Sequence, residues 1–238
     1  MKTIIIIPTY NEKKNISQLI PAIFALNIHG LEIIVVDDNS PDGTAELISE
    51  LCLKYPVKLI KRRAKLGLGS AYIAGFKKAL FLEAEFIGEM DADFSHDPKD
   101  LPRLLEAIQT ADMVIGSRKI KHGKIIGWNW RRKLMSNGAM WFSRLLLGLK
   151  TKDVTAGFRL FRRKVLMTIP LDQISSNGYA FQEEMLYRAE KSGFKIKEIP
   201  VSFADRREGQ SKLSKEDIIE FFIIIIKLKF ARKRTQSN

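Results

Sequence analysis

Two aspartates one residue apart, Asp91 and Asp93, are the part of this sequence best suited to chemistry. They follow a strand-like run, Phe86–Met90, and Pro98 then opens a segment with helical spacing. Two carboxylates at the point where a strand leaves a sheet can bind one hard divalent cation, which shares its remaining positions between water and substrate phosphates. The alternative for an isolated Asp-x-Asp is an acidic, solvated turn that caps the next helix.

The elements that must position these acids follow a repeated strand–helix pattern. The predicted strands are Thr3–Ile7, Leu31–Val36, Val57–Ile60, Phe86–Met90 and Met113–Gly116, and the predicted helices between them are Asn15–Leu26, Gly43–Leu53, Ser70–Leu82 and Pro98–Thr110. This alternation predicts an α/β fold with a mostly parallel, Rossmann-like sheet and helices on both faces.

Polar residues follow four of these strands, at the edge where such sheets bind ligands. The segments are Pro8–Glu12, Asp37–Thr44, Asp91–Asp93 and Ser117-Arg118. Any one of them could be a turn or a cap, and Ser40–Gly43 has turn composition. Four such segments at one edge predict a shared binding site.

A basic segment, Lys61–Lys65, runs into Gly67-Leu68-Gly69 ahead of a predicted helix. A glycine-containing loop at a helix start can cradle a phosphate. The dinucleotide fingerprint is incomplete, however, because Tyr72 stands in place of its third glycine. A nicotinamide-dependent oxidoreductase is therefore disfavoured, and a closely packed helix start near the ligand is the preferred interpretation.

The composition points to an anionic partner. The 238 residues carry a formal net charge of +13, which suits nucleic acid, acidic lipid or a phosphorylated substrate. A basic nucleic-acid-binding module leaves the four polar strand ends unexplained and is disfavoured. The single cysteine, Cys52, excludes an intrachain disulfide framework and fits a reducing compartment.

Residues 119–150 combine basic side chains, two neighbouring tryptophans and an apolar stretch with helical spacing. This pattern predicts an amphipathic segment at a membrane interface, and a core helix with a solvated basic edge is the alternative. No apolar run approaches the about 20 residues that span a bilayer, so a peripheral protein is expected.

The remaining chain is predicted to hold a loop and short strand at Asp153–Phe161, a helix at Phe181–Ala189 and a strand at Lys195–Phe203. A basic, glycine-containing loop at 205–212 is placed to close over a phosphate, with a solvated turn as the alternative. We expect a catalytic domain of residues 1–213, which includes the 119–150 segment, and a C-terminal helix with a polybasic tail at 214–238.

Taken in order, the motifs identify a family. They are Pro-Thr-Tyr-Asn-Glu (8–12), Asp-Asp-Asn-Ser-Pro-Asp-Gly-Thr (37–44), Gly-Leu-Gly-Ser-Ala-Tyr (67–72), Asp-Ala-Asp-Phe-Ser-His-Asp-Pro (91–98), Gly-Ser-Arg (116–118), Gly-Trp…Arg-Arg (127–132), Gly-Phe-Arg (157–159), Gly-Tyr-Ala-Phe-Gln-Glu-Glu (178–184) and Gly-Gln-Ser-Lys (209–212). Over nearly the whole chain the sequence resembles the polyprenol (dolichyl) monophosphate mannose synthases, inverting family 2 glycosyltransferases with a GT-A fold.

The resemblance implies roles for individual residues. It implies that the nucleotide sugar is held by Pro8, Tyr10, Glu12, Val36, Asp38, Asp91, Ala92, Asp93, Ser95, Arg118, Arg206 and Lys212. It implies Mg²⁺ or Mn²⁺ on Asp91 and Asp93, with Ser95 at a position where some members carry glutamine. Arg118 and Arg132 match residues that bind the acceptor phosphate, and Asp91, Asp93, Arg118 and Arg132 form the predicted catalytic set.

The resemblance also implies the reaction, which is transfer of mannose from GDP-mannose to dolichyl or polyprenyl phosphate with inversion. Glucosyl transfer from UDP-glucose to the same acceptor stays open. The acceptor is already anionic, so no base is required, and none of His29, His96 and His122 has a motif partner. We expect the enzyme on the cytoplasmic face of a membrane, plasma membrane or endoplasmic reticulum, with or without a small anchoring subunit, and no nucleic-acid partner.

Overall fold

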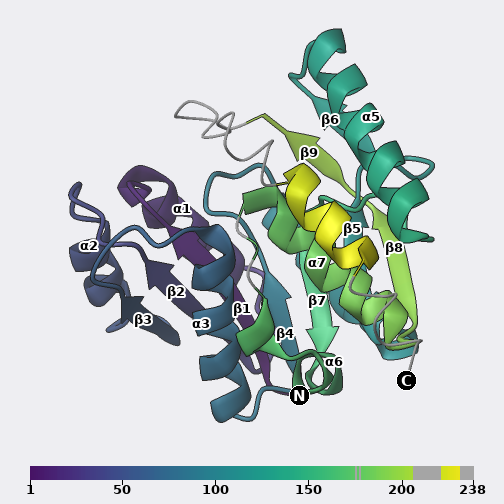
Figure 1. Ribbon diagram of the computed structural model, residues 1–238. Coiled ribbons are helices and arrows are strands. Elements are labelled where there is room, and N and C mark those ends of the chain that lie inside the picture. Colours follow the sequence, from purple (N-terminus) through teal and green to yellow (C-terminus); the bar gives the residue numbers. More distant parts are fainter. Residues whose placement is uncertain (175, 177, 206–220, 231–238) are drawn as a thin grey trace.

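A seven-stranded sheet forms the centre of the computed structural model, which describes residues 1–174, 176, 178–205 and 221–230 (Figure 1). In spatial order its strands are β3 (Val57–Lys61), β2 (Leu31–Asp37), β1 (Thr3–Thr9), β4 (Phe86–Glu89), β7 (Arg159–Arg162), β5 (Met113–Ser117) and β8 (Ile196–Pro200). β7 is antiparallel to both neighbours, whereas the other neighbouring pairs are parallel. The predicted mostly parallel sheet is confirmed.

Helices cover both faces of this sheet (Figure 1). One face carries α1 (Lys13–Phe24), α2 (Thr44–Leu51), the short helices η1 (Pro98–Asp100) and η2 (Ile108–Thr110), and α4 (Leu101–Ala107). The other carries α3 (Leu68–Phe81), α5 (Trp130–Leu147), α6 (Arg163–Thr168), η3 (Leu171–Gln173), α7 (Gly178–Lys191) and the helical residues 221–230.

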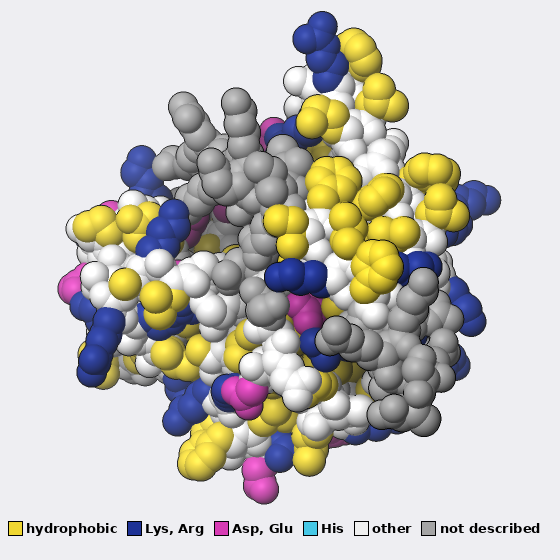
Figure 2. Space-filling model, in the orientation of Figure 1, with side chains coloured by type: hydrophobic (Ala, Val, Ile, Leu, Met, Phe, Trp, Pro, Cys, Tyr) yellow, Lys and Arg dark blue, Asp and Glu magenta, His cyan; other side chains and the backbone are white. Residues whose placement is uncertain are grey.

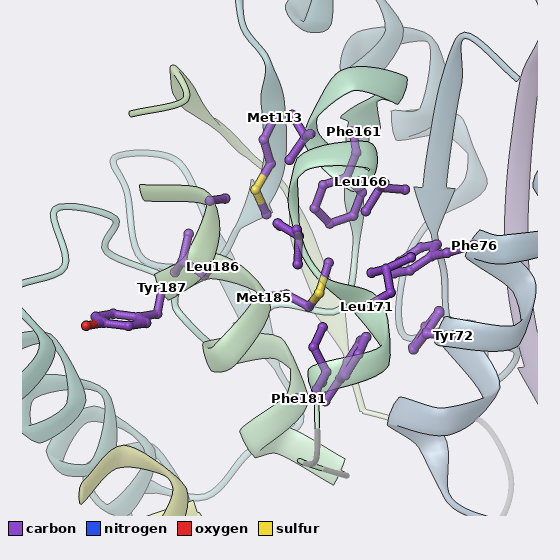
Figure 3. Close-up of a cluster of buried hydrophobic side chains, with 14 of the residues drawn as sticks. Tyr72, Phe76, Met113, Phe161, Leu166, Leu171, Phe181, Met185, Leu186 and Tyr187 are labelled. Atoms are coloured by element: carbon purple, nitrogen blue, oxygen red, sulfur yellow. The ribbon is translucent and has the colours of Figure 1, made fainter. Parts of the chain in front are cut away.

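The isoleucine run of β1 shows why the sheet needs two layers of helices. Successive side chains of a strand point to opposite faces, so Ile4 and Ile6 join one core while Ile5 and Ile7 join the other. A strand buried on both faces is apolar throughout, as the sequence pattern predicted. Figure 3 shows the aromatic part of the first core, where the rings of Tyr72 and Phe181 stack with centroids 5.7 Å apart.

Two glycines let α3 approach its neighbours closely. A Cβ on Gly75 would lie 2.3 Å from Cγ2 of Ile6, and one on Gly69 would lie 2.5 Å from the carbonyl oxygen of Ser176. A real Cβ does not lie this close to a heavy atom that it is not bonded to, so both positions require glycine. The preferred interpretation of Gly67-Leu68-Gly69 as a closely packed helix start is confirmed.

Some predicted elements differ from the structure. The single strand predicted at Lys195–Phe203 is wrong, because the chain forms β8 and then β9 (Ser202–Ala204), which pairs with β6 (Lys124–Ile126) in a separate two-stranded sheet. Pro200 has no N–H to donate, which favours an end to the first ladder at that residue. The α6 helix was not predicted.

At the C-terminal end, residues 221–230 of the predicted helix are helical. The expected domain boundary between 213 and 214 and the polybasic tail lie outside the described residues. Among the helices that are described, none has the length and apolar character required to cross a bilayer.

Candidate active site

The four polar segments predicted to converge do meet at one edge of the sheet. β1, β2, β4 and β5 all run in the same direction, so their carboxyl ends lie together even though β7 separates β4 from β5. Pro8 and Val36, two predicted nucleotide-binding residues, are direct partners in the β1–β2 ladder.

The neighbouring acids at the end of β2 have different tasks. Asp37 is fully buried and accepts hydrogen bonds from Thr9 Oγ1 at 2.9 Å and from the N–H of Ser40 at 2.9 Å, so it shapes the turn. Asp38 accepts from the N–H of Leu66 at 3.1 Å and lies 3.0 Å from Nε of Arg62. Asp38 therefore anchors the basic loop that precedes α3.

Tyr10 and Glu12, two further predicted nucleotide-binding residues, follow β1 at the same edge of the sheet. The ammonium of Lys65 lies 4.7 Å from the centre of the Tyr10 ring, a cation–π contact. Glu12 accepts from Asn15 Nδ2 at 2.7 Å, and its backbone N–H donates to Thr44 Oγ1 at 3.1 Å. Arg206 and Lys212, which the resemblance assigns to the loop over the donor, lie outside the described residues.

Asp91 lies where β4 leaves the sheet, and two buried side chains reach its carboxylate. The Tyr72 hydroxyl donates to Oδ1 at 3.2 Å, and Nε2 of His96 lies 3.4 Å from Oδ2. A Cβ on Gly157 would lie 3.4 Å from Oδ2 and 3.6 Å from Oδ1, so the glycine keeps the space over the carboxylate open. Tyr72 and His96 were not predicted to belong to the site.

Asp93 is buried, and its Oδ1 accepts the N–H of Ser95 at 3.0 Å. No cluster of three or more His, Cys, Asp or Glu side chains suited to a metal ion occurs among the described residues. A pair of carboxylates still fits Mg²⁺ or Mn²⁺, because Mg²⁺ in phosphate-binding enzymes takes one or two carboxylates and fills its other positions with water and phosphate oxygens. The role of Ser95, whose side chain is buried beside this pair, stays a prediction.

Arg118, at the end of β5, is held in a buried ion pair. Its Nε and Nη2 donate to the two oxygens of Asp153 at 2.8 and 2.6 Å, and Nη2 also donates to Thr155 Oγ1 at 2.9 Å. Burial acts to raise the pKa of Asp153, but the Arg118 guanidinium, a hydrogen bond from the Arg118 N–H and the charge of Lys119 together hold that pKa below its usual value. Several N–H groups of the Arg118 guanidinium therefore already donate to protein oxygens, which the sequence did not indicate.

Arg132, in the first turn of α5, lies near Arg118 although 14 residues separate them in the sequence. Its guanidinium lies 4.1 Å from the centre of the Trp128 ring, which Arg118 also approaches at 5.9 Å. Nη1 of Arg132 donates to Oδ2 of Asp205 at 3.0 Å. The structure thus brings the two predicted acceptor residues together around one tryptophan.

Arg159 is fully buried, and its side chain holds the loop that runs from Asp153 to Gly157. It donates to three backbone carbonyls, those of Ala156 at 2.6 Å, Gln182 at 2.6 Å and Val154 at 2.8 Å. That loop carries Asp153 beside Arg118 and Gly157 beside Asp91. The Gly-Phe-Arg motif marked Arg159 in the sequence, but only the fold shows that its side chain points inward.

Two glutamates near Arg159 are buried with raised pKa values. Burial raises the pKa of Glu89 to about 7, although Arg159 acts in the opposite direction. Burial likewise raises the pKa of Glu183 to about 8, against the effects of a 2.9 Å hydrogen bond from Ser143 Oγ and of Arg159. Both carboxyls therefore hold a proton more readily than an exposed glutamate does.

The raised pKa of Glu183 makes the stability of the folded protein depend on pH. Its pKa rises from an ordinary 4.5 to about 8 on folding, so the folded protein binds more protons between these values and its stability falls as pH rises through them. Glu183→Gln removes this penalty, and we expect its melting temperature to exceed that of the wild type by about 10 °C at pH 9 and to lie close to it at pH 5. Glu50→Gln, at an exposed position, is the control; parallel melting curves for Glu183→Gln and wild type would contradict the prediction.

Comparison with known proteins identifies the class of this site. Residues 4–169 match the model of glycosyl transferase family 2, so the chain belongs to that family and is a glycosyltransferase. Crystal structures of glucosyl-3-phosphoglycerate synthase from Mycobacterium tuberculosis share the fold. The one determined with Mn²⁺, UDP and glucosyl-3-phosphoglycerate gives a TM-score of 0.69 at 18% identity, covering 95% of this chain and 79% of that one. The predicted GT-A fold is confirmed.

Three relatives narrow the resemblance. The polyprenol monophosphomannose synthase of Mycolicibacterium smegmatis is 44% identical over 92% of this chain and 83% of its own. The undecaprenyl-phosphate mannosyltransferase of Micrococcus luteus is 43% identical over 90% and 88% of the two chains. The dolichol-phosphate mannosyltransferase of Pyrococcus furiosus is 41% identical over 96% of this chain and 64% of its own. These names agree with the resemblance seen in the motifs and disfavour the oxidoreductase and nucleic-acid alternatives.

Proposed function

We propose that this enzyme transfers mannose from GDP-mannose to the phosphate of a polyprenol, with inversion at the anomeric carbon. The observation that carries the proposal is the identity of 41–44% to three proteins, two named as mannosyltransferases of polyprenyl phosphates and one as a polyprenol monophosphomannose synthase. The arrangement of the site supports it, because the carboxylates Asp91 and Asp93 and the arginines Arg118 and Arg132 suit the two ends of such a reaction.

At the donor end, the leaving diphosphate gains negative charge as the glycosidic bond breaks. A divalent cation, when bound, would neutralise part of that charge. Asp91 and Asp93 would hold it, and the hydrogen bond from Tyr72 orients the Asp91 carboxylate before substrate arrives, with Nε2 of His96 3.4 Å away. Arg206 and Lys212 are proposed to add positive charge over the diphosphate.

At the acceptor end, the nucleophile is a phosphate oxygen that is already anionic, so it needs positioning rather than deprotonation. Arg118 is rigidly oriented by Asp153, whereas the Arg132–Asp205 pair is partly exposed, with 35% and 41% of the two side chains accessible. We propose that the phosphate binds between the arginines and replaces Asp205 as the partner of Arg132.

The donor and the acceptor can be tested in one assay. The purified chain is incubated with undecaprenyl phosphate, Mg²⁺ or Mn²⁺, and either radiolabelled GDP-mannose or radiolabelled UDP-glucose, and the lipid product is extracted. Lipid-linked mannose supports the proposal, whereas lipid-linked glucose alone would favour the alternative donor. Activity of the chain by itself would show that a small anchoring subunit, if one exists, is not required for catalysis.

Membrane association is proposed from a surface that is apolar in the structure. Figure 2 shows hydrophobic side chains gathered over α5 and the helical residues 221–230. The exposed members are Trp130, Leu134, Met135, Trp141, Leu145, Phe222, Ile223, Ile226 and Phe230. The opposite side of α5 is buried through Met140 and Leu147, so the helix serves both alternatives raised by its sequence, as a core element and as an exposed apolar face. We propose that this surface binds the cytoplasmic face of a membrane, which would bring the site close to the lipid acceptor.

Replacing Trp130 and Trp141 together by serine should weaken binding to phospholipid vesicles by at least about tenfold, because both rings are mostly exposed and would be withdrawn from the interface. Vesicle flotation measures the effect. Leu53→Ser, at another highly exposed position, is the matched control. Equal flotation of the double variant and the control would show that this surface does not bind lipid.

A further inference from the structure

Arg118 and Arg132 alone do not supply enough positive charge to balance the phosphate of the acceptor. Arg118 is matched by Asp153 and Arg132 by Asp205, so each pair is close to neutral. A phosphate monoester carries a charge of about −1.5 to −2 at neutral pH. Even when the phosphate replaces Asp205 as the partner of Arg132, only one guanidinium charge becomes available, which is less than the charge that the phosphate carries.

Lys119 lies next to the Arg118–Asp153 pair, and its side chain is hydrogen-bonded to α5. It follows Arg118 directly, its side chain is partly buried, and its Nζ donates to Oδ1 of Asn137 on α5 at 2.6 Å. Asparagine is uncharged, so this contact orients the ammonium without neutralising it. An ammonium has three N–H donors, and Asn137 accepts one of them, which leaves capacity for phosphate oxygens.

The electrostatic environment of Lys119 favours an anion. Burial lowers the pKa of this ammonium, and repulsion from Arg118 and Lys133 lowers it further, whereas Asp153 acts in the opposite direction. Positive groups that repel one another at close range are stabilised by an anion placed among them. Lys119 is therefore in a position to supply positive charge that the two arginine–aspartate pairs lack.

We propose that Lys119, oriented by Asn137, is a third binding residue for the phosphate of the polyprenyl phosphate acceptor. This inference rests on the proposed function and adds a residue to it. It predicts a specific kinetic signature, namely a loss of acceptor binding without a loss of donor binding.

The test uses steady-state kinetics of the full chain in neutral detergent micelles, which removes attraction to anionic lipid. Lys119→Gln should raise the KM for undecaprenyl phosphate about tenfold and leave the KM for GDP-mannose within about twofold of wild type. Lys121→Gln is the control, because Lys121 is an exposed lysine two residues away and the variant makes the same change in net charge. Lys119→Arg should recover part of the loss.

Asn137→Asp provides a second variant that keeps the lysine. The new carboxylate would pair with Lys119, so the KM for the acceptor should again rise about tenfold. Equal KM values for Lys119→Gln and Lys121→Gln would overturn the inference while leaving the proposed function intact. A wild-type chain that makes no lipid-linked mannose would overturn both. A rise in the KM for GDP-mannose alone would assign Lys119 to the donor diphosphate instead and would also overturn the inference.

Discussion

Asp93→Asn is expected to lower kcat about a thousandfold, which corresponds to roughly 4 kcal/mol of transition-state stabilisation. Asp93 is one of only two acids in the Asp-x-Asp segment, so the variant halves the carboxylate charge available to a cation there. The amide keeps the size of the side chain and can still accept the hydrogen bond from Ser95, so the local turn should survive. The measurement is mannosyl transfer at saturating GDP-mannose and acceptor.

Asp97→Asn is the matched control, because Asp97 lies four residues away and caps the next helix by accepting from the N–H of Lys99 at 3.0 Å. It should leave kcat within about threefold of wild type, since asparagine is also a good helix cap. Binding of Mn²⁺ in the presence of GDP, followed by calorimetry, should weaken in Asp93→Asn and not in Asp97→Asn. Full activity of Asp93→Asn would remove the Asp-x-Asp segment from the mechanism and restore its interpretation as an acidic turn.

Arg159→Met is expected to destabilise the fold by about 3–5 kcal/mol, because removing one partner of a buried charge network leaves the other groups unpaired. Three backbone carbonyls would lose their donor, and the buried carboxyl of Glu89 would lose its nearby cation. The measurement is the free energy of unfolding in urea. Activity should fall as well, since the loop between Asp153 and Gly157 would lose its anchor.

Lys164→Met is the control for Arg159→Met, because Lys164 is an exposed cation that pairs with Asp112 at 2.6 Å. Exposed pairs contribute about 0–1 kcal/mol, so this variant should remain close to wild type. If Arg159→Met does not fold, Arg159→Lys retains the charge but not the planar fork, and an intermediate stability is expected. If both Arg159→Met and Arg159→Lys are as stable as the wild type, Arg159 is not the anchor of this loop.

Much of the fold could be predicted because each element has a local cause. The run Thr3–Ile7 had to be a strand buried on both faces, and the boundaries of the first five strands differ from prediction by two residues or fewer. The polar strand ends were also local features, so the edge that holds the site could be found. The position of β7 could not, because no local pattern indicates that a strand from residues 159–162 lies between β4 and β5.

The candidate site likewise has features that were predicted from the sequence and features that only the structure shows. The resemblance carried by the motifs predicts that Asp91, Asp93, Arg118 and Arg132 form a set, and their chemistry agrees with it, since carboxylates suit a cation and arginines suit phosphate. Only the tertiary structure decided what those side chains contact. It places Asp153 against Arg118, His96 and Tyr72 against Asp91, and Asn137 against Lys119. Asp153, Tyr72 and Asn137 are distant in sequence from the residues that they contact. Hydrogen bonds between distant residues depend on how the elements pack, which a linear pattern does not record.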